Sequence, residues 1–260
     1  MTAEPTFARL DGRAADALRP VEIVPGFHRL AEGSCLYRAG GTVVLCTASI
    51  DPTVPAWMEG RNTGWMTAEY QMHPRANPQR REPRDGRGKA PSGRTQEIQR
   101  LVGRALRAAV DLAALGPQTI AIDCDVLEAD GGTRTASITG AFVAVVLALA
   151  KLRQRGTLTR PVLREQGAAI SVGHVGGGLL LDLAYAEDSK ARVDLNLVAT
   201  SEGAIVEVQG TAEGEPVPRS EMDRMIDLGM QGVRSLAAIQ RAAIEAAGVD
   251  YAPLVLPRSP

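Results

Sequence analysis

Hydrophobic residues in the first half of the chain follow a strand-like pattern that gives way to a helical one. Short apolar or β-branched runs predict strands at 21–25, 33–38, 42–50, 64–72 and 119–127. Apolar residues spaced by three and four predict a helix over 95–115. The apolar stretch 141–152 predicts a second helix that ends near Arg153.

The second half repeats this order of strands followed by a helix. Strands are expected at 168–175 and 179–186, as a hairpin around three glycines, and again at 190–199 and 204–209, before a helix over 220–247. We therefore predict an α+β fold in which two similar halves, about 20–155 and 165–248, combine mixed sheet with helices around one core. A single domain would cover 20–250, with a flexible leader over 1–19 and a tail over 251–260.

The distribution of charge along the chain suggests a localised binding site for a polyanion. The chain has 260 residues and a net charge of −1, but arginines crowd the segment 61–107 and acids dominate the last third. Residues 73–93 lack hydrophobic periodicity and read as a long basic loop, which is functional or simply solvated. Because only 3% of the residues are aromatic, base stacking is not expected to dominate any contact with nucleic acid.

Several classes of protein are disfavoured. The three cysteines are an odd number without close spacing, and the three histidines are isolated, so neither a disulfide framework nor a zinc site is expected. The N-terminus lacks the pattern of a signal peptide, and no span of transmembrane length is free of charges. We expect a cytoplasmic protein that does not enter a membrane.

The turn at 130–137, Asp-Gly-Gly-Thr-Arg-Thr-Ala-Ser, is the strongest chemical signal. It joins a predicted strand to a predicted helix, where glycines let backbone N–H groups crowd an anion and the helix N-terminus adds positive potential. Arg134 offers a planar fork of donors suited to phosphate oxygens. The alternative is a tight turn with no ligand.

A second group consists of Asp182, Asp188 and Asp194. If the strands on either side of Ser189 pair as a hairpin, Asp188 and Asp194 approach one another near the connection. Two close carboxylates bind a hard divalent cation or force one of them to carry a proton. Alternatively, Asp188 caps a turn and Asp194 faces solvent.

Motifs for a protein nucleophile, a P-loop or a Rossmann dinucleotide site do not occur in the sequence. Phosphate-binding groups, carboxylates and a basic loop suit phosphoryl transfer, which depends on positioning and charge stabilisation.

Six motifs in order along the chain resemble the RNase PH family of phosphorolytic exoribonucleases. They are 45–50 (LCTASI), 64–70 (GWMTAEY), 93–101 (GRTQEIQRL), 123–127 (DCDVL), 130–141 (DGGTRTASITGA) and 207–216 (EVQGTAEGEP). The resemblance covers nearly the whole chain from Arg19 to about Ala247. It implies an RNase PH-like fold assembled as a hexameric ring, a trimer of dimers.

The resemblance also implies an activity and its residues. Inorganic phosphate, the co-substrate, would attack the 3′-terminal phosphodiester of RNA and release nucleoside 5′-diphosphates, trimming nucleotides beyond the CCA end of tRNA precursors, with rRNA as a further substrate. Matching motif positions assign phosphate binding to Arg94, Gly132, Thr133 and Arg134, and catalytic or metal-binding carboxylates, most simply for Mg²⁺, to Asp188 and Asp194. The tRNA-binding arginines fall on Arg75, Arg80, Arg81 and Arg84.

Two rival functions differ from this reading. A non-catalytic RNA-binding ring subunit would share the fold, and a hydrolytic nuclease would release nucleoside monophosphates instead of diphosphates.

Overall fold

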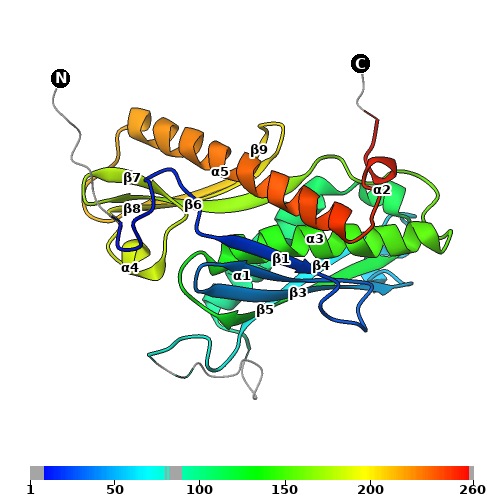
Figure 1. The fold of residues 1–260 in the computed structure, drawn as a ribbon. Coiled ribbons are helices and arrows are strands. Elements are labelled where there is room, and N and C mark those ends of the chain that lie inside the picture. The colour runs from blue at the N-terminus through cyan, green and yellow to red at the C-terminus, as the bar shows by residue number, and fades with distance from the viewer. Residues whose placement is uncertain (1–8, 80, 82–89, 258–260) are drawn as a thin grey trace.

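The structure is a computed structural model that describes residues 9–79, 81 and 90–257. Within them, two β-sheets enclose a long central helix, and further helices lie against the sheets (Figure 1). The expected α+β architecture with one shared core is confirmed, because a single cluster of buried apolar side chains extends from the first sheet to the second.

The first sheet has five strands in the order β1-β2-β3-β5-β4. They are β1 (Val21–Pro25), β2 (Gly33–Ala39), β3 (Thr42–Asp51), β4 (Trp65–Met72) and β5 (Thr119–Glu128). Strand β4 runs parallel to β5, and the other neighbours are antiparallel. The parallel pair needs a long connection, which α1 (Gly93–Ala109) provides.

The second sheet is antiparallel throughout, with the order β7-β6-β8-β9. Its strands are β6 (Gly167–Val175), β7 (Gly178–Leu181), β8 (Val193–Thr200) and β9 (Ile205–Ala212). The expected hairpin around the three glycines is present as β6–β7. The hairpin through Ser189 that would have paired the strands bearing Asp182 and Asp194 does not form, because β6 lies between β7 and β8. The segment after β7 instead forms the short helix α4 (Tyr185–Asp188).

The central helix is α3 (Thr133–Gln154), and every residue from Thr135 to Leu149 is buried. It packs against β2 and β3 of the first sheet and against β6 of the second. By length and composition α3 could cross a membrane, but 89% of its most apolar window is buried inside the protein. A helix that is apolar on all sides is here the core of the fold.

The amphipathic helices lie outside this centre. Helix α1 buries Ile98, Leu101 and Val102 and contacts β4 and α3, while α5 (Arg219–Ala246) packs on β6 and β8. The helix predicted over 95–115 is two helices: Val110 is extended and bridges Leu163, and α2 (Leu112–Leu115) restarts with Asp111 as its N-cap. Two 3₁₀ turns complete the elements, η1 (Ala56–Met58) and η2 (Ala252–Leu254).

Both ends of the described chain are attached to the fold. Arg9 and Arg19 are buried and form ion pairs with residues of the second half, so the prediction of a flexible leader is wrong for residues 9–19. Residues 1–8 lie outside the described part. The C-terminal tail packs as well, since Tyr251 and Leu254 are buried and Val255 bridges Leu163.

The cysteines lie together although the sequence spaces them widely. Cys35, Cys46 and Cys124 face one another on β2, β3 and β5, and all three are buried and free. Burial and the neighbouring thiols raise the pKa of Cys46, with its sulfur contacts to Cys124 and Cys35 as the largest cause. These thiols act as small core side chains.

The tightest approach between a sheet and α3 occurs at Gly33 of β2. A Cβ there would lie 1.8 Å from the carbonyl oxygen of Ala144 and 2.6 Å from the amide nitrogen of Ala148. Both are helix backbone atoms, so relief requires the helix and the sheet to separate.

We predict that Gly33→Ala lowers the free energy of unfolding by about 3 kcal/mol, the upper part of the usual range for overpacking. Urea denaturation at fixed protein concentration measures it. Gly167→Ala is the matched control, since a Cβ there meets its nearest atom at 4.0 Å. Equal midpoints for the two variants would contradict the close contact.

Candidate active site

The site begins at the N-terminus of α3, where the glycine turn has a left-handed backbone. Gly131 and Gly132 have φ of 77° and 64°, and Gly132 is the N-cap without a side-chain cap. The first N–H groups of a helix have no partner within the helix, so this end can bind an anion. A Cβ on Gly131 would lie 2.5 Å from the carbonyl oxygen of Leu183, which explains why this position needs glycine.

The first turn of α3 brings two of the predicted side chains into place. The hydroxyl of Thr133 forms a hydrogen bond of 2.9 Å with the Tyr70 hydroxyl of β4. Arg134 is half-buried, donates to Gln209 Oε1 of β9 at 3.0 Å and lies 3.5 Å from Glu97 of α1. Arg134 is thus oriented by residues from both halves.

Arg94 comes to the same place from the first turn of α1, which starts at Gly93 with Ser92 as its cap. Burial raises the pKa of Tyr70, and the charges of Arg94 and Arg134 oppose the rise. Both guanidinium groups therefore lie within electrostatic range of one hydroxyl. That Arg94 and Arg134 converge on one phosphate from two helix starts stays a prediction.

The two predicted carboxylates share this environment. Asp188 ends α4 and Asp194 is the second residue of β8. Burial raises the pKa of both, the negative charge of Asp188 raises that of Asp194 further, and Arg134 and Arg94 act against both shifts. Asp188 and Asp194 therefore interact, although α4 brings them together rather than a hairpin. Asp182 does not join them, because Arg19 binds its carboxylate.

This pair fits a divalent cation. Two half-buried carboxylates that repel each other are stabilised by a shared positive ion, and Mg²⁺ is commonly held by one or two carboxylates together with substrate phosphate. No cluster of three or more His, Cys, Asp or Glu side chains suitable for a metal occurs in the part of the chain that the structure describes. The donors therefore suit a hard ion that keeps water and phosphate ligands, not a closed structural metal site.

The predicted RNA-binding arginines lie on the connection between β4 and α1. Arg75 and Arg81 are exposed, and Arg80 and Arg84 lie outside the described residues. The start of α1 is the end of this connection, so the basic segment leads directly to Arg94.

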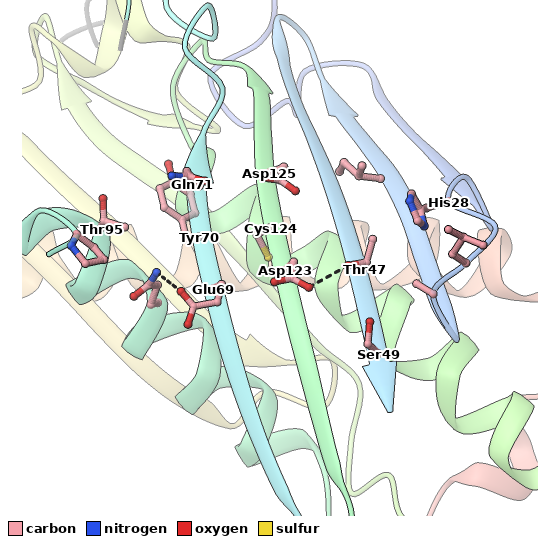
Figure 2. A pocket seen from close by; sticks show the side chains of 15 residues that line it. His28, Thr47, Ser49, Glu69, Tyr70, Gln71, Thr95, Asp123, Cys124 and Asp125 are labelled. Atoms are coloured by element: carbon pink, nitrogen blue, oxygen red, sulfur yellow. Dashed lines mark hydrogen bonds between the residues drawn. The ribbon is translucent and has the colours of Figure 1, made fainter. Parts of the chain in front are cut away.

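A groove of about 610 Å³ lies across the strands of the first sheet, and Tyr70 of β4 and Thr95 of α1 also line it (Figure 2). Glu69, Asp123 and Asp125 line it, and none of Arg94, Gly132, Arg134, Asp188 and Asp194 does. Acidic walls oppose the binding of a phosphate dianion, so this groove is less suited to phosphate than the two helix starts.

Sequence reasoning missed the residues that support the site. Gln209 contacts Arg134, Glu97 and Glu207, and Arg104 forms a bidentate pair with Glu207. Gln209 lies inside the motif 207–216, so the sequence pointed to this residue. The motif did not indicate that Gln209 contacts Arg134. Arg9 and Arg19 lie outside all six motifs, so the sequence did not indicate their ion pairs with Glu187 and Asp182.

Family models match most of this chain. Domain 1 of the 3′ exoribonuclease family matches residues 17–151, and domain 2 matches residues 167–232. The chain belongs to the RNase PH family of 3′ exoribonucleases. The match to domain 1 contains the first sheet and nearly all of α3, and the match to domain 2 contains the second sheet. The candidate site draws its residues from both matched regions.

Solved structures share this RNase PH fold. A crystal structure of Rrp46 from rice, Oryza sativa, has a TM-score of 0.73 at 18% identity, covering 91% of this chain and all of that one. An Archaeoglobus fulgidus exosome with RNA bound to its active site has a TM-score of 0.72 at 24% identity, covering 88% and 91% of the two chains. An archaeal exosome core has a TM-score of 0.69 at 23% identity, covering 90% and 91%. These similarities establish the fold.

We predict that Arg134→Ala weakens the binding of inorganic phosphate at least about tenfold, the equivalent of one charge-assisted hydrogen bond. Isothermal titration calorimetry with phosphate measures the change. Arg38→Ala is the control, because Arg38 sits in an exposed ion pair with Glu22 on the first sheet. Unchanged affinity in Arg134→Ala would remove this residue from the phosphate site.

Proposed function

We propose that this chain is a cytoplasmic phosphorolytic 3′→5′ exoribonuclease that trims nucleotides beyond the CCA end of tRNA precursors. The observation that carries the proposal is geometric: Arg134 at the start of α3 bonds to Gln209 of β9, the neighbour of the strand that bears Asp194, and α4, which ends at Asp188, is hydrogen-bonded to the glycine turn. Family membership supplies the reaction class, and this set of charges supplies the chemistry.

The nucleophile and its target both carry negative charge, so the protein has to hold them together. Arg94, Arg134 and the N–H groups at the start of α3 bind the phosphate dianion. Thr133, with its hydroxyl fixed by Tyr70, lines the same turn. A phosphate oxygen then attacks the phosphorus of the last phosphodiester, the bond to the 3′-oxygen of the preceding nucleotide breaks, and a nucleoside 5′-diphosphate leaves.

The carboxylates serve the departing side of this reaction. Asp188 and Asp194 would hold Mg²⁺, and the ion would supply positive charge that stabilises the negative charge developing on the reacting phosphate and the 3′-oxygen. Glu97 and Gln209 keep Arg134 aimed at the site. One phosphoester is exchanged for an anhydride, so the reaction is readily reversible.

The basic connection between β4 and α1 would bind the tRNA. Arg75 and Arg81 are exposed, and Arg80 and Arg84 belong to the same segment. Arginines that contact phosphates give an affinity that falls steeply with salt. We extend the proposal to a hexameric ring of three dimers, for which light scattering would show six times the mass of 27.5 kDa.

The test of the reaction is a digest of a 3′-extended tRNA with and without inorganic phosphate. We expect nucleoside diphosphates only when phosphate is present, and Arg134→Ala to abolish release while RNA binding survives. Monophosphates without phosphate would show hydrolysis, and RNA binding without release would show a non-catalytic ring subunit. Equal rates on unstructured RNA, together with Arg75→Ala and Arg81→Ala variants that bind tRNA normally, would contradict the tRNA assignment.

The role of the metal has a separate test. We predict that Asp194→Asn lowers turnover about 10²-fold or more, since a bound metal contributes several kcal/mol of charge stabilisation. Because the pKa of Asp194 is raised in the folded protein, its ionised form lowers stability at neutral pH. The melting temperature should therefore stay equal or rise. Asp123→Asn on the open face of the sheet is the control, and full turnover in Asp194→Asn would exclude the metal role.

A further inference from the structure

The N-terminal segment 9–19 is attached to the second half by two buried arginines, Arg9 and Arg19, and Arg13 between them makes longer contacts with Asp182 and Glu187. The side chain of Arg9 is fully buried and forms a bidentate pair with Glu187, from Nε to Oε1 and from Nη2 to Oε2, both at 2.8 Å. It also donates to the carbonyl oxygens of Leu181 at 2.8 Å and Asp182 at 3.0 Å. One guanidinium group thus holds both the strand end before α4 and a side chain of α4 itself.

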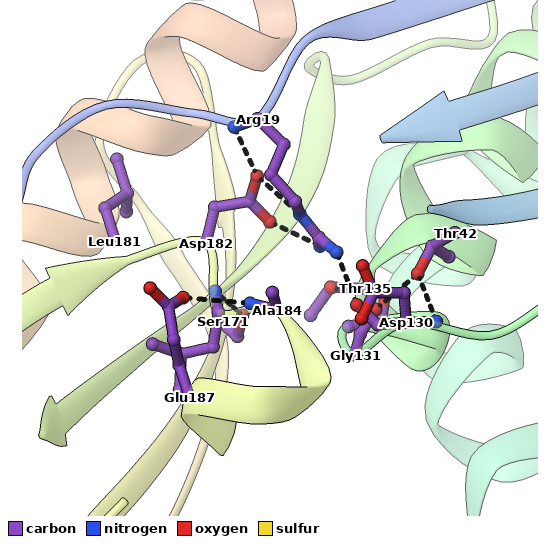
Figure 3. Close-up of polar contacts among 12 residues, drawn as sticks. Arg19, Thr42, Asp130, Gly131, Thr135, Ser171, Leu181, Asp182, Ala184 and Glu187 are labelled. Atoms are coloured by element: carbon purple, nitrogen blue, oxygen red, sulfur yellow. Dashed lines mark hydrogen bonds and ion pairs between the residues drawn. The ribbon is translucent and has the colours of Figure 1, made fainter. Parts of the chain in front are cut away.

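Arg19 makes the second attachment. Its Nη2 and Nε donate to the two carboxylate oxygens of Asp182 at 2.7 and 3.1 Å, and its backbone N–H donates to the same carboxylate at 2.8 Å. Its Nη1 donates to the carbonyl oxygen of Asp130 at 2.5 Å. Figure 3 shows Arg19 between Asp182 on one side and the turn at Asp130 and Gly131 on the other.

Both attachments reach the two elements of the proposed active site, α4 and the glycine turn at the start of α3. Glu187 immediately precedes Asp188, and its carboxylate also accepts the N–H of Ala184 at 3.0 Å, which fixes the start of α4. The N–H of Tyr185 lies 3.2 Å from the carboxylate of Asp130, so α4 is bonded directly to the glycine turn. Asp182 itself has φ of 55°, a conformation that costs energy unless surrounding contacts hold it.

Stability alone does not account for such an arrangement. A buried ion pair is desolvated, and its attraction often only balances that cost. What the two arginines do supply is geometry, because each guanidinium fork fixes two or more backbone or side-chain atoms in one plane. A displacement of about 1 Å in a catalytic group can cost about 10²-fold in rate.

We propose that Arg9 and Arg19 are positioning residues for phosphorolysis. Arg9 acts through Glu187 to set the position of Asp188, and Arg19 acts through Asp182 and Asp130 to set the position of the phosphate-binding turn. This proposal rests on the proposed function and deepens it, since it adds a third segment of the chain to the site.

The roles proposed for Arg9 and Arg19 predict different kinetic losses. Lysine keeps the charge but loses the fork, so Arg9→Lys should lower kcat at least about tenfold with KM for phosphate within twofold. Arg19→Lys should raise KM for phosphate several-fold. Arg38→Lys, in the exposed pair with Glu22, is the matched control and should leave both constants unchanged.

Binding measurements separate this proposal from the reaction itself. Titration with Mn²⁺ followed by electron paramagnetic resonance should show weaker binding in Arg9→Lys, and calorimetry with inorganic phosphate should show weaker binding in Arg19→Lys. If the wild type bound both ions but released no diphosphate, the proposed function would fail, while these two losses would still support the positioning role.

The proposal is overturned if both lysine variants bind Mn²⁺ and phosphate like the wild type. It is also overturned if each variant shows a lower kcat, a higher KM and weaker binding of both ions together, which a general loosening of the fold would cause. Should Arg9→Lys fail to fold, Glu187→Gln keeps the shape and the contact with Ala184 while removing the charge. Wild-type kcat and Mn²⁺ affinity in that variant would overturn the role proposed for Arg9.

Discussion

The burial of α3 between two sheets is the constraint on which the rest of the molecule depends. A helix that is apolar on every side has to be covered on every side, and one sheet covers only one face of it. The first sheet packs on α3 through β2 and β3, and the second through β6. The ends of α3 are therefore the places where the two halves meet and where polar groups reach the surface.

The N-terminal end of α3 becomes a site for this reason. The two halves each place charged groups around one helix start: Arg94 comes from the first half, and Asp188 and Asp194 from the second. Arg134 belongs to α3 and is oriented by both halves through Glu97 and Gln209. Neither half carries all of these groups, so the chemistry depends on the packing that holds the halves together.

Local patterns in the sequence predicted the strands, the central helix and the glycine turn, because those features depend on residues close together in the chain. The sequence also placed Arg94 and Arg134 correctly at the starts of two helices, since a helix start depends on nearby residues. The sequence suggested that a hairpin would bring Asp188 towards Asp194, whereas Asp188 lies at the end of the short helix α4. Periodicity could not show that β6 inserts between β7 and β8, because strand order is decided by contacts across the whole sheet.

The N-terminal segment shows most clearly where local reasoning ends. Apart from Leu10 and Leu18 its residues are polar or small, and a segment with little to bury is expected to be flexible. Arg9 and Arg19 find their carboxylates more than 160 residues later in the chain, at Glu187 and Asp182. Buried charges require such partners, and a pairing over this separation leaves no periodic trace in the sequence. The same separation gives the pairing its effect, because it ties the first residues of the described chain to the α4 carboxylate and to the glycine turn at the start of α3.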